Sequence, residues 1–524
     1  MPRITVENIG VFSVQTGVNL RAALRAEGVF LDGTCADEGR CGRCIVRVLE
    51  GDHGEATPSE RGLLGPDSVR RGERLACRVN PASDLRIRID AERILEVDRS
   101  GRWKETWQSP LWRPESVEPT FEGYGVAVDL GTTSVAEALY DMAMARPLDV
   151  VAGLNPQTPW GEEILSRMAA ARDPEVAGKM RAAVWRAVSD QIRSLCMRNG
   201  VGRGRLRRMV VVGNPAMHHL ALGLPTESLL TPPFEPVTLD ERVLSAVDLE
   251  DLDGPEGSAQ VVFPPLVGGF VGSDVLTAVR CALEKGGAQG CLIDVGTNTE
   301  VVVWKGDRIA AASAPAGPAF EGGHIRSGMR AEEGAIYRVS ISRDGVRYET
   351  IGDASPRGIC GTGIVDLLAG MLREGLIDAT GLMRPGTHPC LDETGLRIDG
   401  KAGVLFEPGD VETVQKAKAA VRAALDLLAA RVGLVEADLE RIYLAGAFGS
   451  RLDALSAIAI GLLPPISKDR CVPAGNTALV GASTVLLSEK AQAESARLAR
   501  QIDHVAISGD PGFEESFLEN LFFT

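Results

Sequence analysis

The sequence predicts a multidomain α/β protein, in which a small domain of one sheet and one helix precedes a larger, glycine-rich α/β domain. Its 524 residues exceed the usual size of a single domain. From residue 123 onward, apolar strands alternate with helical segments such as "VQKAKAAVRAALDLLAARVG". Three of the six tryptophans fall in the stretch between the two regions. We therefore expect a first domain at 1–95, a linker at 96–122 and a second domain at 123–524.

Composition and charge exclude some classes of partner. The net charge of −15 argues against a nucleic-acid backbone, which requires a basic face. The start "MPRITVENIG" has no signal pattern, and no run of about 18 apolar residues suggests a membrane span. Ten cysteines in 524 residues are too few for a disulfide scaffold. We expect a protein of the reducing cytoplasm.

The first domain is predicted to be a small sheet with a short helix. Strands are expected at 4–10, 44–51 and 85–89, and the helix at 17–29. A connection rich in proline and glycine precedes the segment "ERLACRV" at 73–79.

Four cysteines of this domain have the spacing of metal ligands. Cys35, Cys41 and Cys44 share one loop, with five and then two residues between them, and Cys77 follows 33 positions later. This is the plant-type [2Fe–2S] pattern with one extra residue in the first gap. Zinc sites usually pair two short knuckles, so zinc is a weaker alternative, and unrelated thiols are a third. Gly39 gives the loop the backbone freedom to curl around a cluster.

The linker contains Trp103, Trp107 and Trp112 among several prolines. Flexible tethers are usually rich in glycine and serine instead. We interpret the segment as a linker whose aromatic residues pack on a neighbouring domain, in preference to an aromatic binding platform.

Two segments of the second domain resemble each other, at 125–141 and 290–307. Each is an apolar strand that ends in Asp-x-Gly-Thr, followed by a polar turn and a returning strand. Backbone N–H groups of such turns can bind phosphates, hydroxyl groups add donors, and an aspartate can hold Mg²⁺ through water. The candidate residues are Asp129, Gly131, Thr132, Thr133 and Ser134 in the first copy, and Asp294, Gly296, Thr297, Asn298 and Thr299 in the second.

A third element lies at 442–453, "IYLAGAFGSRLD", where an apolar strand breaks into Gly446, Ala447, Phe448 and Gly449. A glycine turn of this kind can lie flat against adenine or ribose. The chain has no Gly-x-x-x-x-Gly-Lys-Ser/Thr loop, which excludes a P-loop nucleotide site. Purely structural hairpins in a large sheet protein remain the alternative.

Both regions resemble known families. The first resembles [2Fe–2S] ferredoxins, with the five-residue first gap of adrenodoxin-like members, which implies a β-grasp fold. The three motifs of the second resemble, in order, the phosphate-one, phosphate-two and adenosine motifs of the actin, sugar-kinase and heat-shock-chaperone ATPases. That resemblance implies a two-lobed, actin-like (ribonuclease-H-like) ATPase fold that binds ATP with Mg²⁺.

The combination is similar to the reductive activators of corrinoid-dependent enzymes. Further motifs carry this resemblance, including "VVGNPAMHHLALGL" (211–224), "PPLVGGFVGSD" (264–274), "PRGICGTGIVDLL" (356–368) and "AGNTALVGA" (474–482). It implies ATP-dependent, one-electron reduction of Co(II) to Co(I) through a [2Fe–2S] cluster. The partners would be a corrinoid protein or corrinoid-dependent methyltransferase and an upstream electron donor, and a homodimer stays open. Some members carry a further domain after the linker, which this chain lacks.

The resemblance also implies residue roles. Asp129 and Asp294 would position Mg²⁺ and the attacking water. Thr132, Thr133, Thr297 and Asn298 would hold phosphates, and Gly446 to Gly449 would border the nucleoside. Two other functions stay open: an ATP-dependent electron donor to a different metalloenzyme, like the activators of 2-hydroxyacyl-CoA dehydratases, and a protein that senses nucleotide and redox state.

Three other features have simpler explanations. His218 and His219 are adjacent on a predicted helix and so do not face one site, which favours a partly buried structural role. Cys360 lies in a glycine loop, and no base can be assigned to it, so a catalytic thiol is disfavoured. The basic stretch at 202–208 is expected to be solvated surface, with contact to an acidic partner as the alternative.

Overall fold

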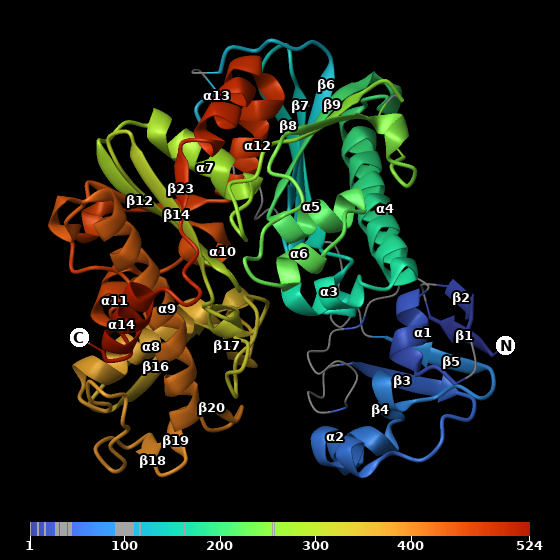
Figure 1. Ribbon diagram of the computed structural model, residues 1–524. Coiled ribbons are helices and arrows are strands. Elements are labelled where there is room, and N and C mark those ends of the chain that lie inside the picture. The colour runs from blue at the N-terminus through green and yellow to red at the C-terminus, as the bar shows by residue number, and fades with distance from the viewer. Residues whose placement is uncertain are drawn as a thin grey trace.

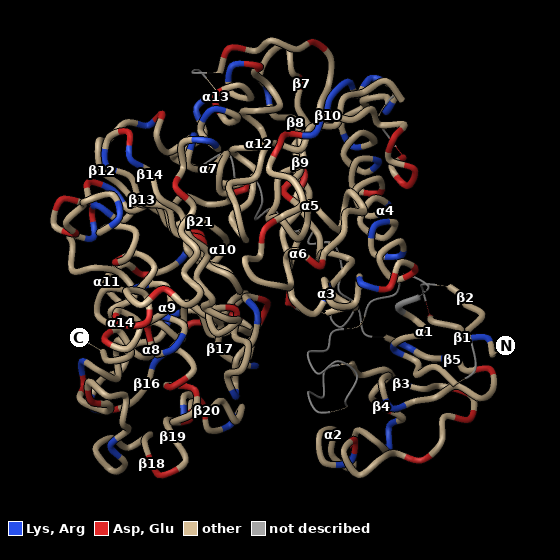
Figure 2. Tube along the Cα trace, viewed as in Figure 1, with Lys and Arg blue, Asp and Glu red and all other residues tan. Residues whose placement is uncertain are grey.

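The structure, a computed structural model, describes residues 2–7, 10–14, 17–26, 31, 39, 44–89, 109–114, 117–161, 163–253, 255 and 257–523. Its sheets divide the chain into an N-terminal domain and two larger lobes, which we call the middle lobe and the C-terminal lobe (Figure 1). Basic and acidic residues are interspersed over all three parts (Figure 2). Among the described residues, no helix is long and apolar enough to cross a membrane.

The N-terminal domain is a five-stranded mixed sheet with strand order β2–β1–β5–β3–β4. The residues of β5 alternate between buried apolar side chains and exposed arginines, and the buried face packs against the first helix. The elements are β1 (Arg3–Val6), β2 (Gly10–Ser13), α1 (Leu20–Ala26), β3 (Ile45–Glu50), α2 (Pro58–Arg70), β4 (Glu73–Leu75) and β5 (Leu85–Arg88).

The prediction of one helix in this domain was wrong, because α2 occupies the expected connection. Thr57 caps α2, with Glu60 completing a capping box and Pro58 in the first turn. Gly65 has φ 76° and precedes Pro66, so the helix is kinked there. Because the same glycine and proline interrupt the helical pattern in the sequence, no helix was predicted there. The single strand expected at 4–10 is likewise a hairpin of β1 and β2.

The described part of the linker packs against both lobes. Leu111 is buried among side chains of the C-terminal lobe, and the Ser109 hydroxyl donates to the carbonyl oxygen of Ala474 at 2.5 Å. The Trp112 ring lies 5.8 Å from the ring of Tyr140 in the middle lobe. This part of the linker therefore packs on its neighbours, as expected. Trp103 and Trp107 lie outside the described residues.

The middle lobe is built on a six-stranded sheet with order β10–β11–β9–β6–β7–β8. The long helix α4 packs on one face of the sheet, and α12 packs on the other. Its elements are β6 (Tyr124–Leu130), β7 (Ser134–Asp141), β8 (Arg146–Leu154), α3 (Ile164–Ala170), α4 (Pro174–Asn199), β9 (Leu206–Gly213), α5 (Pro215–Leu222), α6 (Glu227–Leu230), β10 (Arg242–Ser245) and β11 (Gln260–Phe263).

The C-terminal lobe repeats this plan, with strand order β22–β21–β12–β13–β14–β23. In both lobes an antiparallel three-stranded meander is extended by two parallel strands, so the weak internal duplication in the sequence is a duplicated sheet. The strands are β12 (Gln289–Asp294), β13 (Thr299–Lys305), β14 (Arg308–Ala314), β21 (Arg441–Ala445), β22 (Cys471–Gly475) and β23 (Ile502–His504).

Helices and two small sheets complete this lobe. The predicted helix at 414–433 is the body of α9, which packs against β13 and β14. The helices are α8 (Gly361–Arg373), α9 (Pro408–Val432), α10 (Gly446–Gly449), α11 (Ala454–Ala459) and α14 (Pro511–Glu519). The small sheets contain β15 (Ala335–Ser342), β16 (Gly345–Thr350) and β17 (Gly358–Ile359), and β18 (Leu391–Asp392), β19 (Gly395–Asp399) and β20 (Val404–Phe406).

Two helices connect the lobes: α7 (Ser273–Glu284) and α12 (Thr477–Leu487), which is followed by α13 (Glu489–Ala499) (Figure 1). They cross closely at Gly481, where a Cβ atom would lie 2.4 Å from the Thr277 hydroxyl. α7 packs on β12 of the C-terminal lobe as well as on β9 of the middle lobe. A change in the angle between the lobes would therefore require α7 and α12 to shift relative to each other where they cross.

Candidate functional site

The two segments with Asp-x-Gly-Thr form equivalent hairpins, β6–β7 and β12–β13, in the centres of the two sheets. Asp129 is the penultimate residue of β6, and Asp294 is the last residue of β12. The polar residues that the sequence singled out form the turns after these aspartates. The structure thus gives both copies the strand–turn–strand geometry that was expected.

Buried polar side chains hold the first turn from inside the middle lobe. Asn155 donates to the carbonyl oxygen of Gly131 at 2.7 Å, and Arg167 donates to that of Thr132 at 2.6 Å. Asn214 donates to the Thr132 hydroxyl at 3.0 Å. Since a trans peptide points its C=O and N–H in opposite directions, carbonyls that are held inward turn the following N–H groups outward. That orientation suits a phosphate-binding turn.

The second turn has fewer inward contacts. The Thr297 hydroxyl donates to Glu321 at 3.0 Å, and the Thr299 hydroxyl donates to the carbonyl oxygen of Gly296 at 3.3 Å. Thr299 is fully buried, so it supports the turn from below, whereas Thr297 and Asn298 are partly accessible.

The two aspartates lie close enough to influence each other, across the junction of the lobes. Burial raises the pKa of Asp129 to about 7, and the charge of Asp294 contributes to the shift, although a 2.8 Å hydrogen bond from Asn476 opposes it. Burial also raises the pKa of Asp294 to about 6. Asn476 caps the N-terminus of α12, so the helix that joins the lobes also holds the first aspartate.

Two further carboxyl groups, which sequence reasoning missed, belong to the same cluster. Burial raises the pKa of Asp274 to about 7, with added effects from the charges of Asp129 and Asp294. Burial likewise raises the pKa of Glu300, and Asp274 and Asp294 increase the shift. Asp274 lies in the first turn of α7, outside both Asp-x-Gly-Thr motifs. Glu300 is paired with Asp294 across the second hairpin, which a hairpin register could have indicated.

This cluster, made of Asp129, Asp274, Asp294 and Glu300, favours a cation. Burial raises the pKa of all four carboxyl groups, and neighbouring carboxylates add to the shift in three of them, so a positive ion would stabilise their charged forms. Among the described residues, however, no three His, Cys, Asp or Glu side chains are placed to bind a metal ion directly. A Mg²⁺ ion that keeps its waters and binds phosphates fits this arrangement.

The third motif forms the short helix α10 directly after β21. Gly446 has φ 77°, and a Cβ atom there would lie 2.7 Å from an oxygen of Asp294, so this position requires glycine. Phe448 is half-buried, and its ring stacks 5.2 Å from that of Phe320. The motif therefore adjoins the second aspartate.

Two of the four predicted cluster ligands, Cys44 and Cys77, lie among the residues that the structure describes. The sulfur atoms of Cys44 and Cys77 lie 3.4 Å apart, and both residues are almost fully buried. A disulfide would require about 2.05 Å, whereas two thiolates on one tetrahedral ion, with bonds of about 2.3 Å, lie about 3.8 Å apart. The pair therefore fits a shared metal atom of a cluster. Cys35 and Cys41 lie outside the described residues.

The three features set aside earlier are explained by the fold. His218 and His219 are both buried: His218 contacts Ser273 at the start of α7, and His219 contacts the carbonyl oxygen of Pro225. Cys360 is buried and contacts the carbonyl oxygen of Ile336. The expectation of a solvated surface at 202–208 is wrong for Arg208, which is buried and lies 4.1 Å from the centre of the Phe121 ring in the linker.

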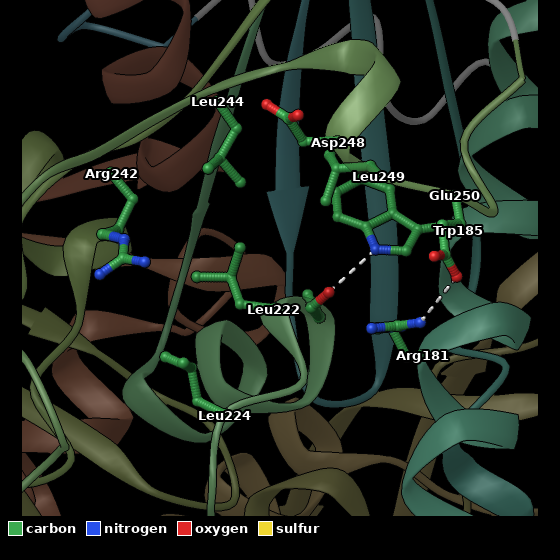
Figure 3. Close-up of a pocket in the computed structure, with 10 residues that line it drawn as sticks. Arg181, Trp185, Leu222, Leu224, Arg242, Leu244, Asp248, Leu249 and Glu250 are labelled. Atoms are coloured by element: carbon green, nitrogen blue, oxygen red, sulfur yellow. Dashed lines mark hydrogen bonds and ion pairs between the residues drawn. The ribbon is translucent and has the colours of Figure 1, made fainter.

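A small cavity of about 180 Å³ lies elsewhere in the middle lobe, between α4, α5 and β10 (Figure 3). Trp185 lines it and donates to the carbonyl oxygen of Ala221 at 2.9 Å, while Arg181 pairs with Glu250 at 3.6 Å. None of the predicted site residues lines this cavity.

Fold and site together define a class of protein: an iron–sulfur domain joined to a duplicated, actin-like ATPase core. Family profiles match all three parts, namely the 2Fe-2S iron–sulfur cluster binding domain at 4–82, the RACo middle region at 124–284 and the C-terminal ASKHA domain of RACo at 289–524. The chain belongs to the RACo family.

Individual relatives agree. The corrinoid activation enzyme RamQ of Eubacterium limosum is 35% identical over 420 residues, which cover 76% of this chain and 70% of RamQ. The Co(II) methylated amine-specific corrinoid protein reductase of Methanosarcina barkeri is 27% identical over 443 residues, covering 76% and 77%. A solved structure of a reductive activator for corrinoid, iron–sulfur protein has a TM-score of 0.68 at 27% identity, covering 100% of this chain and 98% of that one.

Proposed function

We propose that this protein uses ATP to drive the one-electron reduction of Co(II) to Co(I) in a corrinoid protein or corrinoid-dependent methyltransferase. The observation that carries the proposal is that one chain contains both a domain fit for a [2Fe–2S] cluster and an ATPase core in which the charge of Asp294 raises the pKa of Asp129. Relatives that match both parts are named for corrinoid activation and for reduction of a Co(II) corrinoid protein.

The free energy needed to reduce Co(II) explains why the iron–sulfur domain and the ATPase core occur in one chain. Plant-type clusters have potentials near about −400 mV. A gap of roughly 200 mV between donor and acceptor costs about 5 kcal/mol for one electron, since about 59 mV changes the equilibrium tenfold. ATP binding and hydrolysis can cover this cost only when they change the conformation in which the electron is transferred.

At the ATP site, the turns at 131–134 and 296–298 would hold the phosphates, and α10 would border the nucleoside. Asp129 and Asp294 would position Mg²⁺ through its waters and orient the attacking water, with Asp274 and Glu300 adding negative charge. When bound, Mg²⁺ offsets the charge of the phosphates and of these carboxylates. The cysteines Cys35, Cys41, Cys44 and Cys77 would hold the cluster, which would supply one-electron transfer when bound.

The linker offers a physical connection between the two activities. Ser109 binds the carbonyl of Ala474, two residues before Asn476, which holds Asp129. Trp112 packs on Tyr140 of the middle lobe, and Leu111 is buried in the C-terminal lobe. A closing motion of the lobes around nucleotide would therefore move the segment that leads to the iron–sulfur domain.

The substitution Asp294→Ala tests the ATP site. Because this carboxylate would orient Mg²⁺ and water, we expect ATP turnover to be lost while the visible absorbance of the cluster is unchanged. Steady-state hydrolysis and an absorbance spectrum of the same preparation check both statements. Turnover equal to that of the wild type would remove Asp294 from the mechanism.

A further inference from the structure

One buried serine joins three elements behind the first phosphate turn. Ser273 is the first residue of α7, and its side chain is fully buried. The N–H of Gly213, at the end of β9, donates to the Ser273 hydroxyl at 3.1 Å, and the hydroxyl lies 3.2 Å from the carbonyl oxygen of Gly213. The Nε2 atom of His218, on α5, lies 2.9 Å from the same hydroxyl.

This node, formed by Ser273, Gly213 and His218, connects to the proposed ATP site in two directions. On one side, Asn214 follows Gly213 and donates to the Thr132 hydroxyl of the phosphate turn. On the other side, Asp274 follows Ser273, and its pKa responds to the charges of Asp129 and Asp294. The hydrogen bonds of Ser273 therefore connect the turn that contains Thr132 with the start of α7, which carries Asp274.

The backbone just before Ser273 packs closely on the end of β9. A Cβ atom on Gly272 would lie 2.2 Å from the carbonyl oxygen of Gly213 and 2.5 Å from the Cα of Asn214. The backbone before α7 thus touches the end of β9 directly. A shift of Ser273 away from His218 would move the start of α7, and Asp274 with it.

We propose that His218 is a positioning residue for ATP hydrolysis, because its hydrogen bond to Ser273 fixes Asp274 beside Asp129 and Asp294. The inference rests on the proposed function and adds to it a residue that would touch neither nucleotide nor metal.

The surroundings of His218 suit this role. Its ring packs edge-on against Phe263, with 5.1 Å between the ring centres and 83° between the planes, which fixes the orientation of Nε2. Burial lowers the pKa of His218 to about 3, and the neighbouring His219 contributes to the shift. The imidazole is therefore neutral at working pH, and its bond to Ser273 does not change with protonation.

The test uses the full, cluster-loaded chain with His218→Leu, His218→Gln, Ser273→Ala and the double variant His218→Leu/Ser273→Ala. Two kinds of measurement are made: steady-state Mg-ATP hydrolysis at varied free Mg²⁺, and hydrogen–deuterium exchange of residues 272–276, which needs no activity. We expect His218→Leu to lower kcat about tenfold, the lower end of the effect of losing an outer-shell partner. It should also raise the Mg²⁺ concentration at half-maximal rate and speed exchange at 272–276.

Three comparisons distinguish positioning from general stability. The amide of His218→Gln can still reach the Ser273 hydroxyl, so this variant should restore most of kcat. Ser273→Ala should match His218→Leu, and the double variant should be no worse than either, because both break the same interaction. His219→Leu is the matched control. His219 is buried on the same helix but bonds to Pro225 and Val237, so its loss should lower the melting temperature without changing the Mg²⁺ requirement.

Unchanged kcat, Mg²⁺ requirement and exchange in His218→Leu would overturn the inference, as would additive effects in the double variant. If Asp274→Asn abolishes turnover while His218→Leu keeps the wild-type kcat, the positioning role alone is wrong. If the wild-type protein hydrolyses no ATP, the proposed function fails instead.

Discussion

A single carboxylate organises the chain around Cys77 in the N-terminal domain. Glu60 is fully buried and pairs with the equally buried Arg74 at 2.9 Å. It also accepts the N–H groups of Leu75 and Thr57, while Arg74 donates to three carbonyls of the loop at 53–55. Leu75 precedes Ala76, whose N–H donates to the carbonyl oxygen of Cys44. The ion pair thus supports the backbone that presents two of the predicted cluster ligands.

This pair should make the domain sensitive to substitution and to acid. Glu60→Gln leaves the Arg74 charge buried without its partner, which should cost about 3–5 kcal/mol at pH 7. Burial alone would raise the pKa of Glu60, but hydrogen bonds from Arg74 and from backbone N–H groups lower it below the ordinary value. The stabilisation is therefore present above the ordinary glutamate pKa and is lost as the pH falls through the lowered value.

Thermal melts followed by the visible absorbance of the cluster, at pH values from 7 downward, check this prediction. The difference between wild type and Glu60→Gln should shrink as the pH approaches the lowered pKa. Asp84→Asn is the control, because the Arg3–Asp84 pair is exposed and should have no measurable effect. A difference that stays constant at every pH would contradict the assigned role of the Glu60 charge.

Among the elements, the helix crossing between α7 and α12 determines how the lobes are held. At Gly481 an added Cβ would approach not only the hydroxyl of Thr277 but also its backbone carbon, at 2.6 Å. Backbone cannot move as a flexible side chain can, so the two helices would have to separate. The crossing therefore requires glycine.

Gly481→Ala should destabilise the ATPase core by about 1–3 kcal/mol, the usual cost of overpacking. Gly178→Ala is the matched control: Gly178 lies on the exposed face of α4 with no atom near its added Cβ, and alanine there should stabilise the helix by about 0.5–1 kcal/mol. Denaturant unfolding of both variants measures the difference. Equal effects of the two substitutions would show that the crossing is not tightly packed.

The elements also show why some features could be predicted and others not. The hairpins β6–β7 and β12–β13 are local in sequence, so their apolar strands and Asp-x-Gly-Thr turns predicted them. Helix α2 was missed although Thr57 and Glu60 form a capping box, because Gly65 and Pro66 interrupt its pattern. Asp274 joins the carboxylate cluster through long-range packing of α7 between the lobes, which no local pattern encodes.

Across the whole molecule, the linker is the segment that contacts both lobes and leads toward the iron–sulfur domain. Beyond Trp112, the N–H of Thr120 donates to the carbonyl oxygen of Leu487, and the N–H of Glu489 donates to the Thr120 hydroxyl. These contacts fasten the end of the linker to the helices α12 and α13. The linker would then matter little for ATP hydrolysis alone or for electron transfer alone. It would matter more for the coupling of the two.

Trp112→Ala tests this coupling. Loss of the ring contact with Tyr140 should leave the cluster spectrum intact and ATP hydrolysis near the wild-type rate, while fewer electrons reach the corrinoid protein per ATP. The ratio of Co(I) formed to phosphate released measures it. Phe522→Ala, which removes an exposed aromatic ring near the C-terminus, is the control and should keep the wild-type ratio. An unchanged ratio in Trp112→Ala would show that this linker contact does not couple ATP hydrolysis to electron transfer.

ATP is expected to drive electron transfer from the cluster to cobalt. The most direct measurement mixes the reduced protein with Co(II) corrinoid proteins, with and without Mg-ATP, and follows the absorbance of Co(I). We predict that Co(I) accumulates only when Mg-ATP is present. Equal Co(I) without ATP, or a loaded cluster and active ATP hydrolysis with every corrinoid protein left as Co(II), would contradict it.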